Sequence, residues 1–168
     1  MSSLSITKKS YSFQDFFPLL SKSVRISLDK DVKIKVNTSY KNLLSLLSSG
    51  KTIYGVNTGF GRLSQIKIRD SDQSKLQLNL VRSHSAGVGN SLDSGIVRVM
   101  MALKVLNYSH GYSGVHPDTV KILVQFLNND IIPVVPEKGS VGASGDLAQL
   151  AHVALSIIGE GKVLHNGR

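Results

Sequence analysis

The chain has 168 residues, of which 41% are hydrophobic and 18% charged, so its length fits one domain and its composition excludes intrinsic disorder. Cysteine is absent, which excludes disulfides, zinc–thiolate sites and a cysteine nucleophile, and no apolar run approaches the roughly 20 residues that span a bilayer. The net charge of +9 lies in residues 1–90, but without a run of five basic residues or interleaved aromatic residues, so neither nucleic-acid nor membrane binding is predicted.

The first 50 residues predict two short pieces followed by a longer helix. Residues 12–20 (SFQDFFPLL) form a short amphipathic segment, and residues 24–28 (VRISL) form a short strand. Residues 29–49 become helical toward their leucine-rich end. Gly50 is placed to end that helix, because glycine readily adopts the left-handed conformation of a C-cap.

The rest of the chain predicts four more helices, at residues 71–86, 94–110, 117–130 and 145–158. Asp70 or Ser71 caps the first, and Gly111 stops the second. Pro117 opens the third at a position where its missing N–H costs little, and the prolines of IIPVVP (131–136) require an extended connector. The last helix is predicted to bury residues that recur at helical spacing, namely Leu147, Leu150, Ala151, Ala154 and Ile158. We therefore expect one mainly α unit with minor β.

Two glycine-rich segments, IYGVNTGFG (53–61) and GSVGASGD (139–146), precede predicted helices, where free N–H groups and the helix dipole favour an anion. Neither fits G-x-x-x-x-G-K-[ST] or G-x-G-x-x-G, so these phosphate-binding loops are not predicted. A G-x-S-x-G hydrolase turn centred on Ser144 also fails, because Asp146 stands where the second glycine is needed. A Ser-His-Asp hydrolase stays an alternative, since His84, His152 and Asp146 are available as its other members.

The tripeptide Ala143-Ser144-Gly145 suits a different chemistry, in which the backbone cyclises on itself. In a sharply bent loop, the unhindered nitrogen of Gly145 can reach the carbonyl carbon of Ala143, which is flanked only by a methyl group. Loss of the Ser144 hydroxyl as water then creates an exocyclic methylene. Protein side chains include no strong carbon electrophile, so this ring would supply an electron sink made from the protein itself.

A resemblance to a known family is carried by four segments, YGVNTGFG (54–61), LQLNLVRSHSAGVG (76–89), GVHP (114–117) and GSVGASGDLAQLAH (139–152). In order and spacing they resemble the aromatic amino acid ammonia-lyases, which include enzymes that act on histidine, phenylalanine and tyrosine. The resemblance implies that residues 1–168 are a single N-terminal segment of a larger helical-bundle fold. Residues 1–112 would form its N-terminal region with the Tyr54 loop, and residues 113–168 would begin the central helical region.

By this resemblance, Ala143, Ser144 and Gly145 form a 4-methylidene-imidazole-5-one ring autocatalytically, and no metal or dissociable cofactor is required. Gly142 supports the loop that holds the ring. Asp146 either assists ring formation or serves as an ordinary acid at a helix N-terminus.

Tyr54 matches the tyrosine that removes the β-proton of the substrate in this family. A phenol is a weak acid, so this role needs an environment that stabilises the phenolate, such as the N–H groups of a glycine loop. Gly55, Gly59 and Gly61 then give the loop its shape, with Gly61 also on the substrate side. Asn57 either fixes the turn or faces the substrate.

His84 matches the position at which histidine and tyrosine ammonia-lyases carry a histidine that faces the substrate side chain. A histidine can hydrogen-bond an imidazole or a phenol, and a site built on that bond disfavours a substrate without it. Leu80 lies one turn earlier on the same predicted helix and supports this position. His110, His116 and His152 have no metal-ligand spacing and are expected to be structural.

The implied reaction is elimination of ammonia from an L-amino acid, with histidine giving urocanate as the first expectation. Tyrosine giving coumarate stays open, because Gln149 replaces the proline of many family members, as it does in some bacterial members that act on tyrosine. Attack of the ring methylene on the amine or on the aromatic ring of the substrate also stays open.

The resemblance also implies a homotetramer whose sites draw residues from different subunits. The first 13 residues contain no apolar signal segment, so a cytoplasmic location is expected. Enzymes of the family are several times longer than this chain, so a truncated, non-catalytic lyase-like module is the other alternative. In such a module, residues 147–158 would lack packing partners.

Overall fold

A computed structural model describes residues 3–21, 24–141, 145 and 147–168. Helices dominate these ranges and the strands are short, so the predicted mainly α architecture with minor β is confirmed. None of the helices in the described ranges combines the length and the apolar character that crossing a membrane requires.

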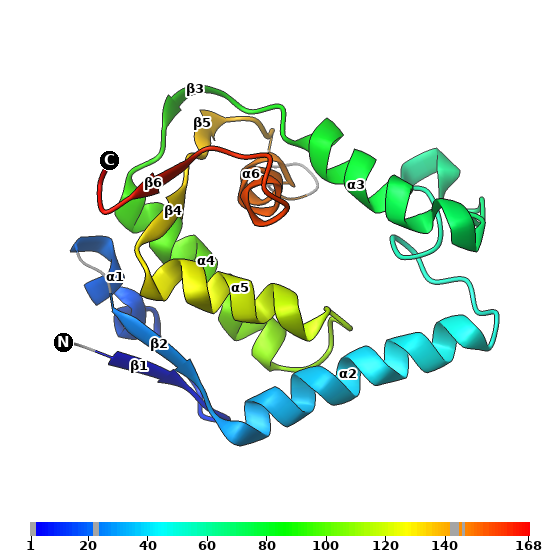
Figure 1. The fold of residues 1–168 in the computed structure, drawn as a ribbon, viewed down its shortest axis with the longest axis horizontal. Coiled ribbons are helices and arrows are strands. Elements are labelled where there is room, and N and C mark those ends of the chain that lie inside the picture. Colours follow the sequence, from blue (N-terminus) through cyan, green and yellow to red (C-terminus); the bar gives the residue numbers. More distant parts are fainter. Residues whose placement is uncertain (1–2, 22–23, 142–144, 146) are drawn as a thin grey trace.

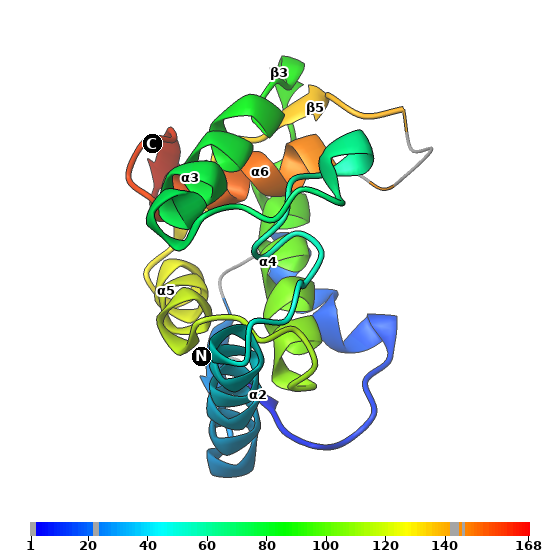
Figure 2. The same ribbon diagram turned by 90° about the vertical axis from the view of Figure 1, so that its right-hand side faces the viewer.

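Two neighbouring helices, α4 (Ser94–Ser109) and α5 (Pro117–Asn128), build the centre of the molecule. They pack side by side in both views (Figures 1 and 2). Their shared interior consists of apolar side chains that are almost fully buried, namely Val97, Met101, Ala102, Val105, Val120, Leu123 and Leu127. Burial of this apolar area is the main favourable term for the fold.

Local signals set the ends of these two helices, and two of them, Gly111 and Pro117, were predicted from the sequence. The Asp93 carboxylate accepts a hydrogen bond from the Gly95 N–H at 2.7 Å and caps the start of α4. Gly111 follows the end of α4 with a φ of +73°, a conformation that favours glycine. Pro117 stands in the first turn of α5.

Helix α2 (Lys30–Ser48) runs along the edge of the molecule, at the opposite end from α3 and α6 (Figure 1). Asp29 caps it by accepting from the Asp31 N–H at 2.8 Å, and Gly50 follows with a φ of +80°. The predicted helix is confirmed, but it is helical from Lys30 onward rather than only toward its leucines. It buries little more than Val32 and Val36.

A small parallel sheet covers the N-terminal side of the core. Strand β1 (Ser3–Ile6) pairs with β2 (Arg25–Leu28), and the 3-10 helix η1 (Phe13–Phe16) and α1 (Pro18–Ser21) form the crossover. Strand β2 and the amphipathic segment before it are confirmed. Strand β1 was not predicted, since four residues of alternating pattern at a chain end give a weak signal.

Two further strand pairs connect the helices. Strand β3 (Val88–Ser91) lies antiparallel to β5 (Pro136–Lys138), and β4 (Ile131–Pro133) lies antiparallel to β6 (Val163–His165). The extended connector predicted from the two prolines is therefore confirmed, and its residues pair with partners from distant parts of the chain.

Helices α3 (Gln73–His84) and α6 (Leu147–Ile157) pack against each other at one end of the molecule (Figure 2). Both are shorter than predicted. A 3-10 turn, η3 (Asp70–Asp72), takes the place of the first predicted turn of α3, so neither predicted cap residue stands directly before the α-helix.

The predicted buried face of α6 is largely wrong. Leu147 is 54% exposed and Ile158 is 42% exposed, and Leu150 is exposed as well. The buried residues of α6 are mostly small ones, namely Ala148, Ala151, Val153 and Ser156. The helix is apolar around most of its circumference, so its periodicity could not indicate which side packs against α3.

Candidate functional site

The loop that carries Tyr54 is held by its own buried side chains. The Asn57 carbonyl Oδ1 accepts from the Ile53 N–H at 2.7 Å, and its Nδ2 donates to the Lys51 carbonyl at 2.9 Å. Thr58 Oγ1 accepts from the Gly55 N–H at 3.1 Å. Asn57 is 2% exposed, so its amide fixes the turn, and a direct contact with substrate would require these bonds to break.

Glycines shape the same loop. Gly55 and Gly61 have φ values of +73° and +54°, which L side chains rarely adopt. A Cβ at Gly59 would lie 2.5 Å from the Leu63 Cβ, so this position admits no side chain without rearrangement. The predicted shaping role of the three glycines agrees with these conformations.

Three rings form a row from the loop to α3. The ring centroids of Tyr54 and Phe60 are 5.3 Å apart, and those of Phe60 and His84 are 6.5 Å apart. Tyr54 is 63% exposed, whereas His84 is half-buried. The structure thus brings the predicted base and the predicted specificity residue to one side of the molecule.

Helix α3 fixes both ends of this row. Gln77 Nε2 donates to the carbonyls of Gly55 and Val56 at 3.1 and 3.2 Å, which ties the Tyr54 loop to the helix. His84 Nδ1 donates to the Leu80 carbonyl at 2.8 Å. Nε2 of His84 has no hydrogen bond within the described ranges, so the neutral ring presents it as an acceptor.

A cavity of about 310 Å³ lies between α3 and α6. Its lining includes Phe60, Leu80, His84, Leu147 and Leu150. The cavity therefore connects the aromatic row to the first turn of α6, which directly follows the tripeptide.

Most of the predicted ring segment lies outside the described residues, namely Gly142, Ala143, Ser144 and Asp146. Gly145 is described and has a φ of +102°, and its carbonyl accepts a hydrogen bond from Ser140 Oγ at 3.0 Å. A Cβ at Gly145 would meet no atom of the described residues, and the positive φ by itself favours glycine here.

Two contacts that the sequence did not indicate fasten α3 to the C-terminal part of the chain. Arg82 pairs with Glu160, with Nε donating to Oε2 at 2.8 Å, and this guanidinium holds the pKa of the Glu160 carboxyl below its usual value. The Gly87 N–H donates to His152 Nε2 at 3.1 Å. Both pairs are far apart in the sequence, so no local pattern reveals them.

The remaining histidines have structural positions. His116 Nδ1 accepts from the Asp118 N–H at 3.2 Å at the start of α5, and His110 is the C-cap residue of α4. Burial lowers the pKa of His152. Among the described residues, no three histidine, aspartate or glutamate side chains come together as metal ligands.

Replacing Gln77 with leucine tests the tie between α3 and the Tyr54 loop. We expect the loop amides from Ile53 to Gly59 to exchange with deuterium about fivefold faster, the effect of losing about 1 kcal/mol of hydrogen bonding. Gln73→Leu is the control, because Gln73 donates to Asp70 and not to the loop. Equal exchange in the two variants would show that Gln77 does not hold the loop.

His152→Gln tests the half-buried acceptor on α6. The folded state disfavours protonation of His152, whereas the unfolded chain binds the proton at an ordinary pKa of about 6.5. The contribution of neutral His152 to the free energy of unfolding should therefore be fully present above about pH 6.5. It should decrease as the pH falls below that value. The glutamine carbonyl can still accept from Gly87 but does not titrate, so the decline should be smaller in this variant.

Chemical unfolding at pH 7.5 and pH 5.5 measures this difference, with His110→Gln as the control. A loss of stability between the two pH values that is as large in His152→Gln as in the unchanged chain would contradict the assignment.

Comparison with known proteins agrees with this arrangement. A family model described as aromatic amino acid lyase matches residues 11–168. A probable histidine ammonia-lyase from Thermoplasma acidophilum is 44% identical over 165 residues, which are 98% of this chain and 33% of that protein. The histidine ammonia-lyase of Treponema denticola is 43% identical over 165 residues, 98% of this chain and 32% of that protein.

A solved structure of tyrosine aminomutase from Streptomyces globisporus has a TM-score of 0.90 at 34% identity, and covers 99% of this chain and 31% of that one. The chain thus spans about a third of the length of the relatives that it matches. The family model matches nearly the whole chain and the fold agrees with that of this solved structure, so the chain belongs to the aromatic amino acid lyase family.

Proposed function

We propose that this chain supplies the general base and the electrophile of an ammonia-lyase that converts L-histidine to urocanate and ammonia. The observation that carries the proposal is the cavity between α3 and α6, whose lining includes Phe60, His84 and Leu147. It lies between the Tyr54 loop and the helix that follows the tripeptide. A base and an electrophile must act on neighbouring atoms of one substrate, so they need a shared cavity of this kind.

The proposed electrophile is the 4-methylidene-imidazole-5-one ring formed from Ala143, Ser144 and Gly145. The Gly145 nitrogen bonds to the Ala143 carbonyl carbon, whose oxygen leaves as the first water with the N–H hydrogens of Gly145 and Ser144, so that a C=N bond forms to the Ser144 nitrogen. The Ser144 hydroxyl leaves with the hydrogen on its Cα as the second water. The positive φ of Gly145 supports this step, since closure needs a sharply bent backbone.

The ring would supply an electrophilic methylene carbon, the electron sink that protein side chains lack. In the proposed reaction, Tyr54 Oη accepts the β-proton of the substrate, and the bond between Cα and nitrogen breaks with its electron pair on the departing ammonia. A double bond forms between Cα and Cβ, giving the unsaturated acid. Tyr54 does not itself line the cavity, but its ring is exposed and lies 5.3 Å from that of Phe60, which does, and this supports its role as the base.

His84 is the proposed specificity residue. Its Nδ1–H donates to the Leu80 carbonyl, so Nε2 can accept a hydrogen bond from the imidazole N–H of the substrate histidine. The phenol of tyrosine can donate to the same atom. Tyrosine is therefore the second candidate substrate, and the similarity to a tyrosine aminomutase supports it. The two histidine ammonia-lyase relatives, at 44% and 43% identity, favour histidine.

The whole enzyme is proposed to be a cytoplasmic homotetramer. Large apolar side chains on α2 and α6 are exposed in this chain, including Leu44, Leu147 and Leu150. Such side chains usually contact another surface. In the whole enzyme, further helices of the central region, which begins at residue 113, or other subunits would cover them. The division into an N-terminal region, residues 1–112, and a central region is part of the same proposal.

Tyr54→Phe tests the base in a chain extended beyond Arg168 to the length of the relatives. We expect kcat for histidine to fall by about 10²–10⁴-fold, because general-base catalysis contributes about that much. Urocanate formation measures the rate. Tyr112→Phe is the control, since Tyr112 is exposed and lies away from the cavity. A Tyr54→Phe enzyme with unchanged kcat would exclude Tyr54 as the base.

His84→Leu tests substrate choice in the same extended chain. Removing the acceptor leaves the substrate N–H unpaired, so kcat/KM for histidine should fall at least about tenfold. His165→Leu, an exposed position on β6, should leave it unchanged. Parallel assays with tyrosine distinguish the candidates, and inactivity of the unchanged enzyme on both substrates would overturn the proposed function.

A further inference from the structure

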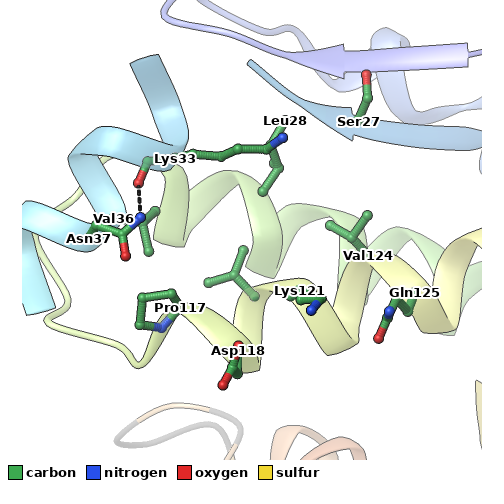
Figure 3. A pocket seen from close by; sticks show the side chains of 11 residues that line it. Ser27, Leu28, Lys33, Val36, Asn37, Pro117, Asp118, Lys121, Val124 and Gln125 are labelled. Atoms are coloured by element: carbon green, nitrogen blue, oxygen red, sulfur yellow. Dashed lines mark hydrogen bonds between the residues drawn. The ribbon is translucent and has the colours of Figure 1, made fainter. Parts of the chain in front are cut away.

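A second cavity, of about 450 Å³, opens where β2, α2 and α5 meet (Figure 3). It shares no lining residue with the cavity beside His84. Helix α5 separates the two: Thr119 and Leu123 face the first cavity, whereas Val120 and Val124 face the second. This cavity therefore has no part in the proposed lyase reaction. Its size is within the range of small-molecule sites.

The floor of this second cavity is aliphatic. Val36 and Val120 are almost fully buried, and Leu28, Pro117 and Val124 are half-buried around them. Among the described residues, no aromatic side chain lines the cavity. An apolar ligand body can therefore displace water from this floor without disturbing a polar network.

The rim of the cavity carries two cations on facing elements, Lys33 on α2 and Lys121 on α5 (Figure 3). Both side chains are exposed, and neither forms an ion pair with an acid in the described part of the chain. The Asn37 Nδ2 donates to the Lys33 carbonyl at 2.8 Å, which leaves its Oδ1 at the rim.

Asp118 is the single acid among the lining residues. Its carboxylate lies 3.7 Å from His116 Nδ1 and points away from Lys33 (Figure 3). The rim thus has two positive charges and one negative charge, a balance that suits a ligand with one negative charge. Residues 1–41, which contribute β2 and the first part of α2, carry 8 bases and 3 acids and reinforce this preference.

We propose that this second cavity binds a hydrophobic monocarboxylate. The apolar body of the ligand lies against Val36, Val120 and Val124, and its carboxylate is held between the ammonium groups of Lys33 and Lys121. The site is separate from the catalytic cavity, so it does not depend on the ring or on Tyr54.

Methyl NMR of the 168-residue chain, labelled at valine and leucine, tests the site with octanoate as the probe. Octanoate should shift the methyl signals of Leu28, Val36, Val120 and Val124 in a saturable manner, and it should leave those of Val163 on β6 unchanged. The same titration with octanol tests the need for charge, and acetate tests the need for an apolar body. Each should bind at least about tenfold more weakly, a difference of about 1.4 kcal/mol.

Charge reversal provides the matched variants. Lys33→Glu and Lys121→Glu should each weaken octanoate binding by about tenfold or more, whereas Lys41→Glu, an exposed position farther along α2, should not. These substitutions are at exposed positions, so the fold should survive, and the unshifted methyl spectrum without probe verifies this.

Three results with the 168-residue chain would overturn the proposal. The first is the absence of saturable shifts, and the second is equal binding of octanol and octanoate. The third is equal weakening by all three lysine variants. A fourth result would be a chain extended past Arg168 that fails to bind octanoate while the 168-residue chain binds it. Another part of the polypeptide would then fill the cavity, and this result would likewise overturn the proposal.

Discussion

The hydrogen bonds from Gln77 to the carbonyls of Gly55 and Val56 join the Tyr54 loop to α3, and the arrangement of the candidate site depends on them. A glycine-rich loop has many accessible conformations, so its tyrosine has no defined place unless a rigid element holds the backbone. Helix α3 is that element. It carries His84 at its end, and the Arg82 and Glu160 pair fastens it to the segment after α6. One helix therefore positions both the proposed base, Tyr54, and the proposed specificity residue, His84.

The central helices provide the rigid support for this arrangement. Helices α4 and α5 bury a continuous apolar interior, while α6 approaches its neighbours through small residues such as Ala148 and Ala151. Small residues permit close packing, and the larger Leu147 and Leu150 then line the cavity instead of filling the core. The exposed apolar side chains follow from the same packing, because the remaining faces of α2 and α6 have no partner within the described chain.

Sequence reasoning succeeded where the controlling interaction is local. Pro117 starts α5 as predicted, and the glycines after α2 and α4 end those helices. The glycine motif around Tyr54 likewise identified the loop. The buried face of α6 could not be predicted, because the helix is apolar on most sides and only its neighbours decide which side packs. The tie between Arg82 and Glu160 joins residues 78 positions apart, and the double hydrogen bond of Asn57 depends on the folded path of the loop.

The central claim is that this chain makes its own electrophile beside the Tyr54 loop. Mass spectrometry of the peptide that contains Ala143, Ser144 and Gly145, with Ser144→Ala as the control, measures this most directly. The account predicts the loss of two waters, localised to these three residues, in the unchanged chain and not in the variant. An unmodified peptide from the folded protein, in the 168-residue chain and in a chain of the relatives' length alike, would contradict it.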